Sequence, residues 1–543
     1  MAIQIAGAFA RFGWPCSLCG KDILPGDGIA TEVIPGALKF DQPKQSNSKW
    51  SHYKCLDTIR GKQSDIHAAH NVAGYVKRKG KACKPRSRKI TNQQRKYTTP
   101  KSTRTNVGLN SERDLATVGD LHTADTILGF DILTSVLPQW CKREGVNFRE
   151  YALKTRDLKV EVRLLDPPRS DERSREDGYS LIRLSRSHPK KREWAIPGDT
   201  SILLSGREQG PVDELTSVLA AADHYPQTSY GDRERQISII AMEAAIRGIR
   251  IDVDELGRQL SGPQSCGTLK SIQHNQTGGR VHPHVDASTA TGRLSVSCPN
   301  PTSLGKRGSL LEQRKVLIPD EGECFLSVDL RQIEVRTVAA LSQDPDMLAL
   351  FVEGRDIYTE VAEDLLGDPR KRDAAKEIVL GLSYGMGNQK IAEAANIDQA
   401  TARNFVRGMA EKYPLWTSWL EEVIYRSRRQ GSLRTLHGRR VHVPASSATT
   451  AGPARLVQST ARDIFMDGVL RMDELGLTEH LRLMLHDEVL MSVPIQEYEQ
   501  FAARTIECLS TTWTPPGLKF AVPIEASAGL PGSTWADCYR GEK

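Results

Sequence analysis

The apolar and polar positions of the C-terminal half alternate in patterns that predict many helices and a few short strands. Residues 234–247 place apolar side chains at helical spacing, and Gly248 follows them, which is typical of the end of a helix. Residues 324–328 and 481–493 carry apolar runs and alternations that are typical of buried strands. We therefore expect an α+β domain over residues 232–543.

The N-terminal half is less regular and divides into three segments. Residues 1–60 predict a small module, residues 61–110 are polar and basic and predict a flexible linker, and residues 111–231 predict a further domain to which the pattern assigns no fold. Within that domain the apolar residues 124–140 predict a helix, and the charged residues 166–177 predict a loop.

Length and composition exclude several classes of protein. A chain of 543 residues, of which 39% are hydrophobic, is long enough for about two to four globular domains. The chain has no apolar run of about eighteen residues and no secretory signal at its start, so we expect no membrane partner and a cytoplasmic location. The ten cysteines are then expected to be reduced or bound to metal.

The net charge of +7 hides a local concentration of cations. Between Lys77 and Arg104 the sequence has twelve Lys and Arg residues and no Asp or Glu, so the remainder of the chain sums to 7 − 12 = −5. This segment predicts a polyanionic partner, with Lys77, Arg78 and Lys79 as candidate contacts to DNA. A solvated linker is the alternative interpretation, and it is compatible with binding because a disordered basic arm can still contact phosphates.

Two residue pairs in the N-terminal module have the spacing of zinc ligands. Cys16 and Cys19 form a C-x2-C pair, His52 and Cys55 form an H-x2-C pair, and 32 residues separate the two pairs. Each pair can hold one edge of a tetrahedral Zn²⁺ site, and a module with so small a core gains stability from a metal. The alternative is two unlinked surface pairs. The role of the module, whether in gripping DNA, docking a partner or scaffolding, stays open.

Carboxylates follow or interrupt both of the predicted C-terminal strands. The apolar residues 325–328 run into Asp329, and Asp487 and Glu488 interrupt the alternating residues 481–493, as at the tip of a β-hairpin. If these strands pair in one sheet, Asp329 and Asp487 meet. Two neighbouring carboxylates repel each other unless cations lie between them, and a pair of Mg²⁺ ions is the usual arrangement for phosphoryl transfer.

A third cluster falls between these two. Arg372, Lys376, Leu380 and Tyr384 recur at every fourth position, so on a helix they lie along one stripe. Such a stripe suits a nucleoside triphosphate, because its cations can bind the phosphates and its apolar end can contact the base. An ordinary amphipathic helix with a solvated basic end is the alternative for this cluster alone.

Together and in this order, the three clusters resemble the A, B and C motifs of the DNA polymerase I family, family A. Residues 289–295 (T-A-T-G-R-L-S), 314–319 (R-K-V-L-I-P), 435–440 (T-L-H-G-R-R) and 458–463 (Q-S-T-A-R-D) are also similar to segments of that family. The resemblance covers about residues 232–543. It implies a right-hand fold with an antiparallel palm sheet, helical fingers and a thumb.

The resemblance also implies an activity and residue roles. The activity is template-directed addition of deoxynucleotides to a primer, with primer–template DNA, deoxynucleoside triphosphates and other replication proteins as partners, in replication or repair. Asp329 and Asp487 would hold two Mg²⁺ ions, with Glu488 beside them and Lys376 as a candidate proton donor. The resemblance assigns nucleotide binding to Arg314, Gln332, Glu334, Tyr358, Arg372, Lys376, Leu380 and Tyr384. It assigns contacts with DNA to Arg293, Gln458 and His486.

The sequence departs from the family at several places. Leu330 and Arg331 replace Tyr and Ser of motif A, Leu380 replaces an aromatic residue of motif B, and Tyr358 replaces a His. About 35 residues separate Asp254 from Thr291, where the family has a helical thumb of about a hundred, so we expect a reduced thumb. Residues 107–225 contain no D-x-E, so we expect no proofreading exonuclease. Residues 111–231 are then expected to be either a vestige of the family's exonuclease domain or an unrelated module. This combination, with a zinc module, resembles a bacteriophage or mobile-element polymerase.

Two other functions compete with this interpretation. A single-subunit RNA polymerase shares the palm and the R-x3-K helix, but Glu334 stands where RNA enzymes carry a small residue that admits the ribose 2′-oxygen. A catalytically inactive or weak polymerase scaffold that only binds DNA is the second alternative, and the retained Asp329, Asp487, Arg372 and Lys376 argue against it.

Overall fold

The computed structural model describes residues 120–165, 199–203, 217–222 and 227–540, apart from positions 264, 288 and 307, and several short strands nearer the N-terminus. The chain divides into two compact units, residues 1–101 and 102–543. In the described residues, no helix has the length and apolar character needed to cross a membrane.

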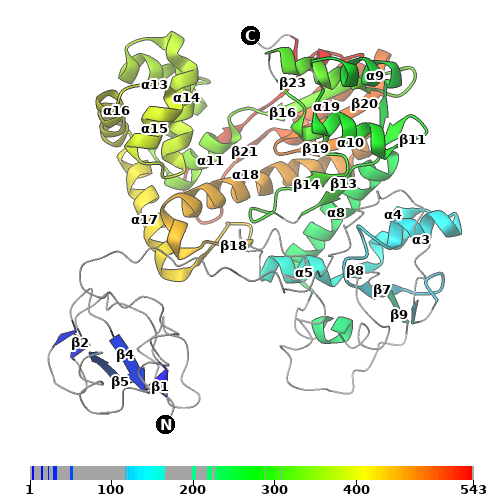
Figure 1. Ribbon diagram of the computed structural model, residues 1–543, viewed down its shortest axis with the longest axis horizontal. Coiled ribbons are helices and arrows are strands. Elements are labelled where there is room, and N and C mark those ends of the chain that lie inside the picture. The colour runs from blue at the N-terminus through cyan, green and yellow to red at the C-terminus, as the bar shows by residue number, and fades with distance from the viewer. Residues whose placement is uncertain are drawn as a thin grey trace, which may run out of the picture. The chain divides into compact units, whose positions relative to one another are not determined.

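The first unit contains short antiparallel strands (Figure 1). Strands β1 (Ile3–Gln4), β4 (Ile29–Glu32) and β5 (Lys49–His52) form one sheet, and β2 (Trp14–Pro15) pairs with β3 (Asp22–Ile23). The expected zinc ligands Cys16, Cys19 and Cys55, and the side chain of His52, lie outside the described residues, as does the basic segment.

A four-stranded antiparallel sheet forms the centre of the second unit, in the order β19-β20-β16-β23. Its strands are β19 (Leu481–Leu485), β20 (Glu488–Pro494), β16 (Glu323–Leu330) and β23 (Ala526–Ala528). Most positions of β16 and β20 are buried on both faces of the sheet, which explains why they read as continuous apolar runs. Helix α8 (Ser229–Arg247) contacts β19, and α19 (Tyr498–Leu509) contacts β16 and β23.

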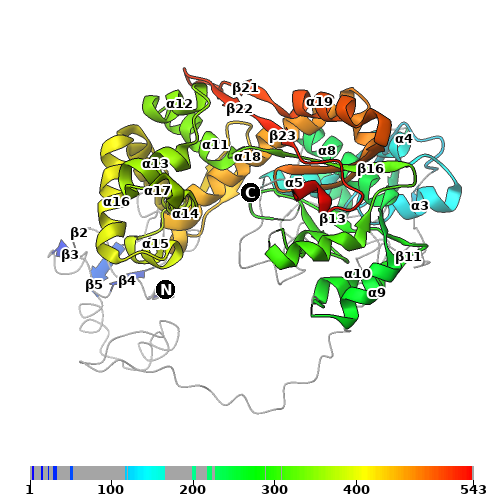
Figure 2. The ribbon, with the colours of Figure 1, turned by 90° about the horizontal axis from the view of Figure 1, so that it is seen from above.

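The helices between β16 and β19 form a separate lobe beside the sheet (Figures 1 and 2). Three of their starts are capped by aspartates, Asp344, Asp356 and Asp398, whose carboxylates accept backbone N–H groups of the first turn. The lobe's helices are α11 (Ile333–Ser342), α12 (Pro345–Val352), α13 (Ile357–Leu366), α14 (Arg372–Ser383), α15 (Asn388–Ala395), α16 (Gln399–Lys412) and α17 (Pro414–Gln430). The long helix α18 (Ala448–Glu474) contacts α11, α17 and α19, so it links the lobe to the sheet.

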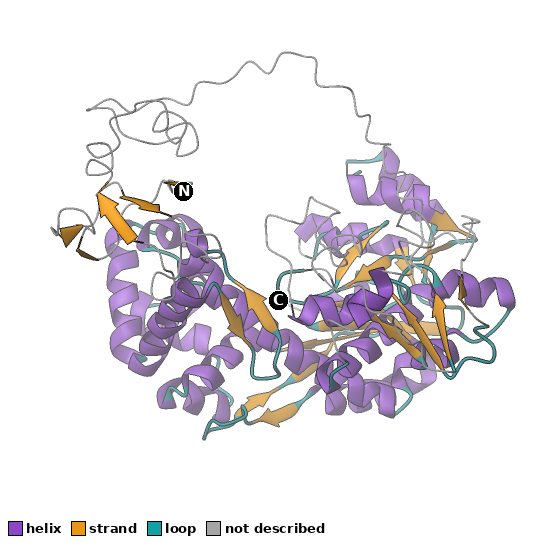
Figure 3. Ribbon diagram, turned by 90° about the horizontal axis from the view of Figure 1, so that it is seen from below, coloured by secondary structure: helices purple, strands orange, loops and turns teal. Residues whose placement is uncertain are grey.

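The segment expected to hold a reduced thumb contains two short helices, α9 (Val253–Ser261) and α10 (Gly267–Asn275). They lie beside a small sheet in the order β11-β12-β10-β15, formed by Gln276–Thr277, Arg280–Val281, Ile249–Ile251 and Leu317–Ile318. The hairpin of β13 (His284–Asp286) and β14 (Ser295–Ser297) follows. Figure 3 shows the helices and strands of the described residues from below, coloured by secondary structure.

Residues 124–140 do not form the predicted helix. Strand β7 (Thr126–Gly129) occupies the first part, and α3 (Leu137–Glu144) begins only after it. Strand β7 pairs in parallel with β8 (Thr155–Asp157) and β9 (Thr200–Leu203), and a Cβ on Gly129 would lie 2.4 Å from the carbonyl oxygen of Leu203. A buried parallel strand is apolar throughout, so hydrophobicity alone does not distinguish it from a buried helix.

This mixed sheet belongs to a small module that shares an apolar core with the rest of the second unit and is joined to it by ion pairs as well. Its helices are α3, α4 (Phe148–Leu153) and α5 (Leu158–Leu165). On α5, Arg163 donates to both carboxylate oxygens of Asp286 on β13, and Lys159 lies 3.9 Å from the same carboxylate. The module therefore contacts the hairpin that carries the T-A-T-G-R-L-S turn.

Candidate active site

Sheet pairing brings the two predicted metal-binding carboxylates to one edge of the central sheet. Strands β16 and β20 are antiparallel with Asp329 opposite Glu488, and the N–H of Leu330 donates to the carbonyl oxygen of Asp487 at 3.0 Å. The β19–β20 turn consists of His486 and Asp487, with His486 at φ 38°, in the left-handed region. The predicted hairpin with carboxylates at its tip is therefore present in the structure.

The surroundings of Asp329 and Asp487 disfavour the charged forms of both carboxyl groups. Burial, followed by the carboxylates of Asp329 and Glu334, raises the pKa of the Asp487 carboxyl to about 6, against the opposing effects of Arg293 and Lys306. Burial, together with the charge of Glu488, also raises the pKa of Asp329, although Lys306 opposes the shift. Clustered carboxylates of this kind are expected to attract cations.

Oxygen ligands from one or two carboxylates, completed by phosphates of a substrate, are the set that Mg²⁺ commonly uses. Among the described residues, no group of three or more His, Cys, Asp or Glu side chains is arranged to hold a metal by itself. Asp329 and Asp487 thus fit Mg²⁺ as carboxylates that need further oxygens, from water or from a bound substrate, and they do not fit a closed structural metal site.

Glu488 is buried and held by hydroxyl groups. Its Oε1 accepts a hydrogen bond from Ser327 at 2.6 Å and one from the Tyr539 hydroxyl, while its Oε2 lies 3.3 Å from the ammonium of Lys306. Ser527 donates to Asp329 Oδ1 at 3.3 Å. These contacts fix the orientation of two of the three carboxylates at the sheet edge.

The predicted triphosphate-binding stripe lies on α14, as expected. Arg372 stands at the start of the helix, Lys376 lies partly exposed one turn on, Leu380 is partly buried, and Tyr384 follows the last turn. Arg372 donates to Asp356 Oδ2 at 2.7 Å, and Gln332 of motif A donates to the same oxygen at 2.8 Å. Asp356 therefore joins motif A to the cationic end of α14.

Tyr358 is almost fully buried, and its ring lies 5.4 Å from the Arg372 guanidinium. The aromatic face supports the cation from the side opposite solvent. Tyr358 thus contacts Arg372, the predicted phosphate-binding residue, and has almost no solvent-exposed surface itself.

Glu334, the predicted sugar gate, lies in the first turn of α11 and has two partners. Arg293 donates to its Oε1 at 2.6 Å, and the Tyr384 hydroxyl donates to its Oε2. Gln458 of α18 hydrogen-bonds Tyr384 in turn. Four residues that the sequence assigned to nucleotide and DNA contacts are therefore connected in one hydrogen-bonded chain.

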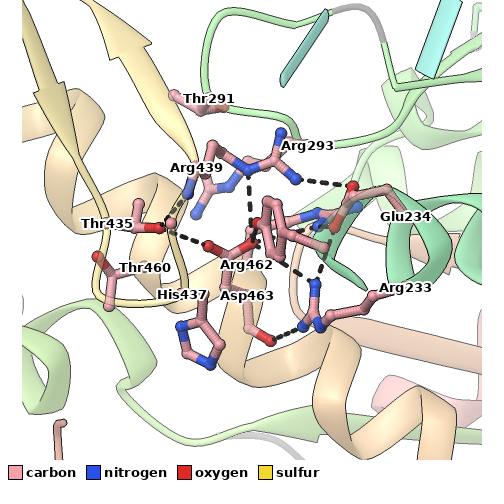
Figure 4. A network of polar contacts seen from close by, with 12 residues as sticks. Arg233, Glu234, Thr291, Arg293, Thr435, His437, Arg439, Thr460, Arg462 and Asp463 are labelled. Carbon is pink, nitrogen blue, oxygen red and sulfur yellow. Dashed lines mark hydrogen bonds and ion pairs between the residues drawn. The ribbon is translucent and has the colours of Figure 1, made fainter. Parts of the chain in front are cut away.

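A buried ion cluster joins α8, residues 435–440 and α18, the helix that carries Gln458 (Figure 4). Glu234 of α8, which is 4% exposed, pairs with Arg439 at 2.7 Å and with Arg462 of α18, and Thr435 donates to Asp463 at 2.9 Å. Burial alone would raise the pKa of the Glu234 carboxyl, but Arg439 and Arg462 outweigh burial and hold that pKa well below its usual range.

The same cluster supports the turn that carries Arg293. Gly292 has φ 74°, and a Cβ there would lie 2.3 Å from the guanidinium of Arg439. A side chain at this position would collide with Arg439, so glycine is required both by conformation and by space. The residues 435–440 and 458–463, which resemble the family only as sequence, thus form a structural support for the active site.

Arg314 lies apart from the open surface. It is 4% exposed, donates to the carbonyl oxygen of Leu304 at 3.3 and 3.2 Å, and lies 3.7 Å above the Trp535 ring. Its guanidinium is also 4.9 Å from the ring of Tyr539, whose hydroxyl holds Glu488. Arg314 therefore packs on Trp535 and Tyr539, and through Tyr539 it is connected to Glu488.

Five contacts of the site were missing from the sequence interpretation: Ser327, Asp356, Ser527, Tyr539 and Lys306. Ser327 precedes Asp329 by two positions, so strand periodicity places it on the same face and could have indicated it. Asp356 was readable as a helix cap but not as a partner of Arg372. Tyr539 and Lys306 reach the site from distant segments, and no local pattern marks them.

Comparison with known proteins agrees with this geometry. The sequence profile of DNA polymerase family A matches residues 258–537, and the chain belongs to this family. The chain is 33% identical over 288 residues to the thermostable DNA polymerase I of Thermus thermophilus and 31% identical over 282 residues to the DNA polymerase I of Deinococcus radiodurans. These matches cover 49% and 48% of this chain but only 34% and 29% of the relatives.

A solved structure is similar in fold. It is the POL domain of Pol1 from M. smegmatis in complex with DNA primer-template and dNTP, with a TM-score of 0.58 and 18% sequence identity. The similarity covers 73% of this chain and 84% of the other. The second unit therefore has the family A polymerase fold, with the central sheet as palm and the helical lobe as fingers.

Proposed function

We propose that this chain is a template-directed DNA polymerase that extends a primer by two-metal phosphoryl transfer. The observation that carries the proposal is the meeting of Asp329 and Asp487 at one sheet edge, joined through Gln332 and Asp356 to the cationic end of α14. Carboxylates and phosphate-binding cations are thereby held on one rigid framework, which positioning catalysis requires.

The proposed roles of the site residues follow from their charges. Asp329 and Asp487 would hold Mg²⁺, which when bound neutralises charge on the transferred phosphate. Arg372 and Lys376 would bind the triphosphate, and Arg372 would exchange its ion pair with Asp356 for phosphate oxygens. Glu488, held by Ser327 and Tyr539, keeps the charge at the sheet edge high without needing a place in the reaction.

Primer extension separates this function from its competitors. With Mg²⁺ and deoxynucleotides the full chain should extend a DNA primer, whereas an inactive scaffold would only bind it and an RNA polymerase would favour ribonucleotides. We also propose that the chain lacks proofreading, so the primer should keep its length when nucleotides are left out. Shortening of the primer from its 3′ end would contradict that part.

Replacing Glu334 by alanine should weaken selection against ribonucleotides. Arg293 and Tyr384 hold the Glu334 carboxylate at the start of α11, so its loss opens space that a 2′-hydroxyl can enter. We expect the ratio of kcat/KM for a deoxynucleotide to that for its ribonucleotide to fall by about ten- to a hundredfold. Glu363→Ala, an exposed acid on α13, is the matched control, and an unchanged ratio in Glu334→Ala would remove Glu334 as the gate.

We further propose that Cys16, Cys19, His52 and Cys55 bind one Zn²⁺. Their spacing supports the proposal, because two residues between ligands form the knuckle of many zinc sites. Elemental analysis of the purified full chain should give one zinc per molecule, and Cys16→Ser should lower that number strongly while Cys83→Ser should not. A metal-free full chain that stays folded at its N-terminus would refute the site.

The cations from Lys77 to Arg104 are proposed to contact DNA phosphates. Each phosphate neutralised on duplex DNA contributes roughly −0.9 to the slope of log K against log salt. Deleting residues 1–106 should therefore weaken primer–template binding and flatten this slope by several units in filter-binding assays. Equal slopes for the two chains would make the segment a tether only.

A further inference from the structure

One cation of this chain already lies between Asp329 of the proposed metal site and its neighbour Glu488. The Lys306 ammonium is 3.3 Å from Glu488 Oε2 and 3.9 Å from Asp329 Oδ2, and it lies 4.8 Å above the ring of Tyr539. Lys306 belongs to no helix or strand and precedes the 3-10 helix of residues Gly308–Val316. None of the A, B and C motifs contains it.

In each of these two carboxylates, one oxygen accepts hydrogen bonds from hydroxyl groups and the other lies nearest to Lys306. Glu488 Oε1 is held by Ser327 and Tyr539, and Asp329 Oδ1 accepts from Ser527. The oxygens nearest the ammonium are the others, Glu488 Oε2 and Asp329 Oδ2. A divalent cation held by Asp329 would therefore meet the ammonium at the same place.

The backbone that precedes Lys306 is closely packed at Gly305, whereas the Lys306 side chain is partly exposed. The N–H of Gly305 donates to Gln313 Oε1 at 3.2 Å, and a Cβ on Gly305 would lie 2.2 Å from the Cβ of Leu310. Glycine is thus needed for this close approach. The Lys306 side chain is 40% exposed, so it can turn to solvent without disturbing the core.

We propose that Lys306 is an internal counter-ion of the metal site, which occupies the carboxylate edge when metal is absent and is displaced when a divalent cation binds. The inference rests on the proposed function only in assuming a metal at Asp329. An ammonium compensates one negative charge, and a divalent cation compensates two, so the metal can replace it but must first compete with it.

This competition has two consequences that do not depend on catalysis. The ammonium weakens the binding of metal to the free protein, since like charges repel. It also stabilises the metal-free carboxylates, which repel one another without it. Removing the charge should therefore tighten metal binding and make the stability of the protein more dependent on metal.

Manganese binding to the full chain, without DNA or nucleotide, tests the proposal. Free Mn²⁺ would be followed by electron paramagnetic resonance, and the signal of the Asp329→Asn chain would be subtracted to isolate the site. Lys306→Met, which keeps the aliphatic stem but removes the charge, should bind Mn²⁺ on the order of tenfold tighter than the wild type. Lys306→Arg should not bind more tightly than the wild type, and Lys315→Met, in the same segment but paired with Glu312, should match it.

Thermal unfolding provides the second measurement. The Tm difference between Mn²⁺ and chelator should be larger in Lys306→Met than in the wild type. Equal or weaker Asp329-dependent binding in Lys306→Met, or no such binding in any chain, would overturn the proposal. Failure of primer extension together with tighter binding in Lys306→Met would overturn the polymerase function and leave the counter-ion role standing.

Discussion

Asp487→Asn is expected to lower single-nucleotide incorporation by about 10³-fold or more while leaving the chain folded. Asparagine keeps the shape of the side chain but removes the charge that a divalent cation requires. Burial, with the carboxylates of Asp329 and Glu334, raises the pKa of Asp487 to about 6, so the folded chain disfavours the charged form of this carboxyl. Loss of the charge should therefore leave the stability of the metal-free chain unchanged or slightly higher.

Single-turnover incorporation and thermal unfolding would be measured side by side for Asp487→Asn. Asp346→Asn, an exposed acid at the start of α12, is the control for removal of one carboxylate and should keep wild-type rates. Near-normal incorporation by Asp487→Asn would show that the chemistry takes place elsewhere in the chain.

Glu234→Ala is expected to destabilise the second unit by about 3–5 kcal/mol. The substitution leaves Arg439 and Arg462 buried with Asp463 as their main remaining counter-charge, because Glu234 pairs with both arginines. Uncompensated buried charge costs far more than the loss of a surface ion pair. The turn at Gly292, which packs on Arg439, should loosen with the cluster.

Denaturant unfolding measures this loss, and Glu312→Ala provides the control. Glu312 pairs with Lys315 on the surface, so its removal should cost at most about 1 kcal/mol. A Glu234→Ala chain as stable as the control would mean that the cluster has another source of compensation. Limited proteolysis around residues 287–294 would show whether the turn opens as expected.

The sequence was most informative where charge interrupts an apolar pattern. Asp329 at the end of one apolar run and Asp487 within an alternation predicted a strand and a hairpin, and β16, β19 and β20 confirm them. Residues 124–140 mix apolar side chains with polar ones such as Asp125 and Asp131 and carry no comparable marker. The pattern was then equally compatible with a strand and a helix. Only the structure, in which β7 pairs in parallel with β8 and β9, shows that a strand forms there.

The partners of the site residues were harder to predict than the residues themselves. Glu334, Arg293 and Tyr384 were each selected, but their hydrogen bonds depend on how α11, α14 and the Gly292 turn pack. Lys306 reaches Glu488 from a loop and Tyr539 from a short 3-10 helix, Asp537–Tyr539, and neither segment carries a periodic pattern. Contacts of this kind arise only from the tertiary arrangement, which a single sequence specifies but does not display.

Selection of the incoming nucleotide by the templating base tests the proposed polymerase function most directly. Four primer–templates that differ only in the templating base would be offered one deoxynucleotide at a time in Mg²⁺, with the Asp487→Asn chain as the inactive reference. We expect each template to select its complementary deoxynucleotide by at least about a hundredfold in kcat/KM. No incorporation on any template, or incorporation that ignores the templating base, would contradict it.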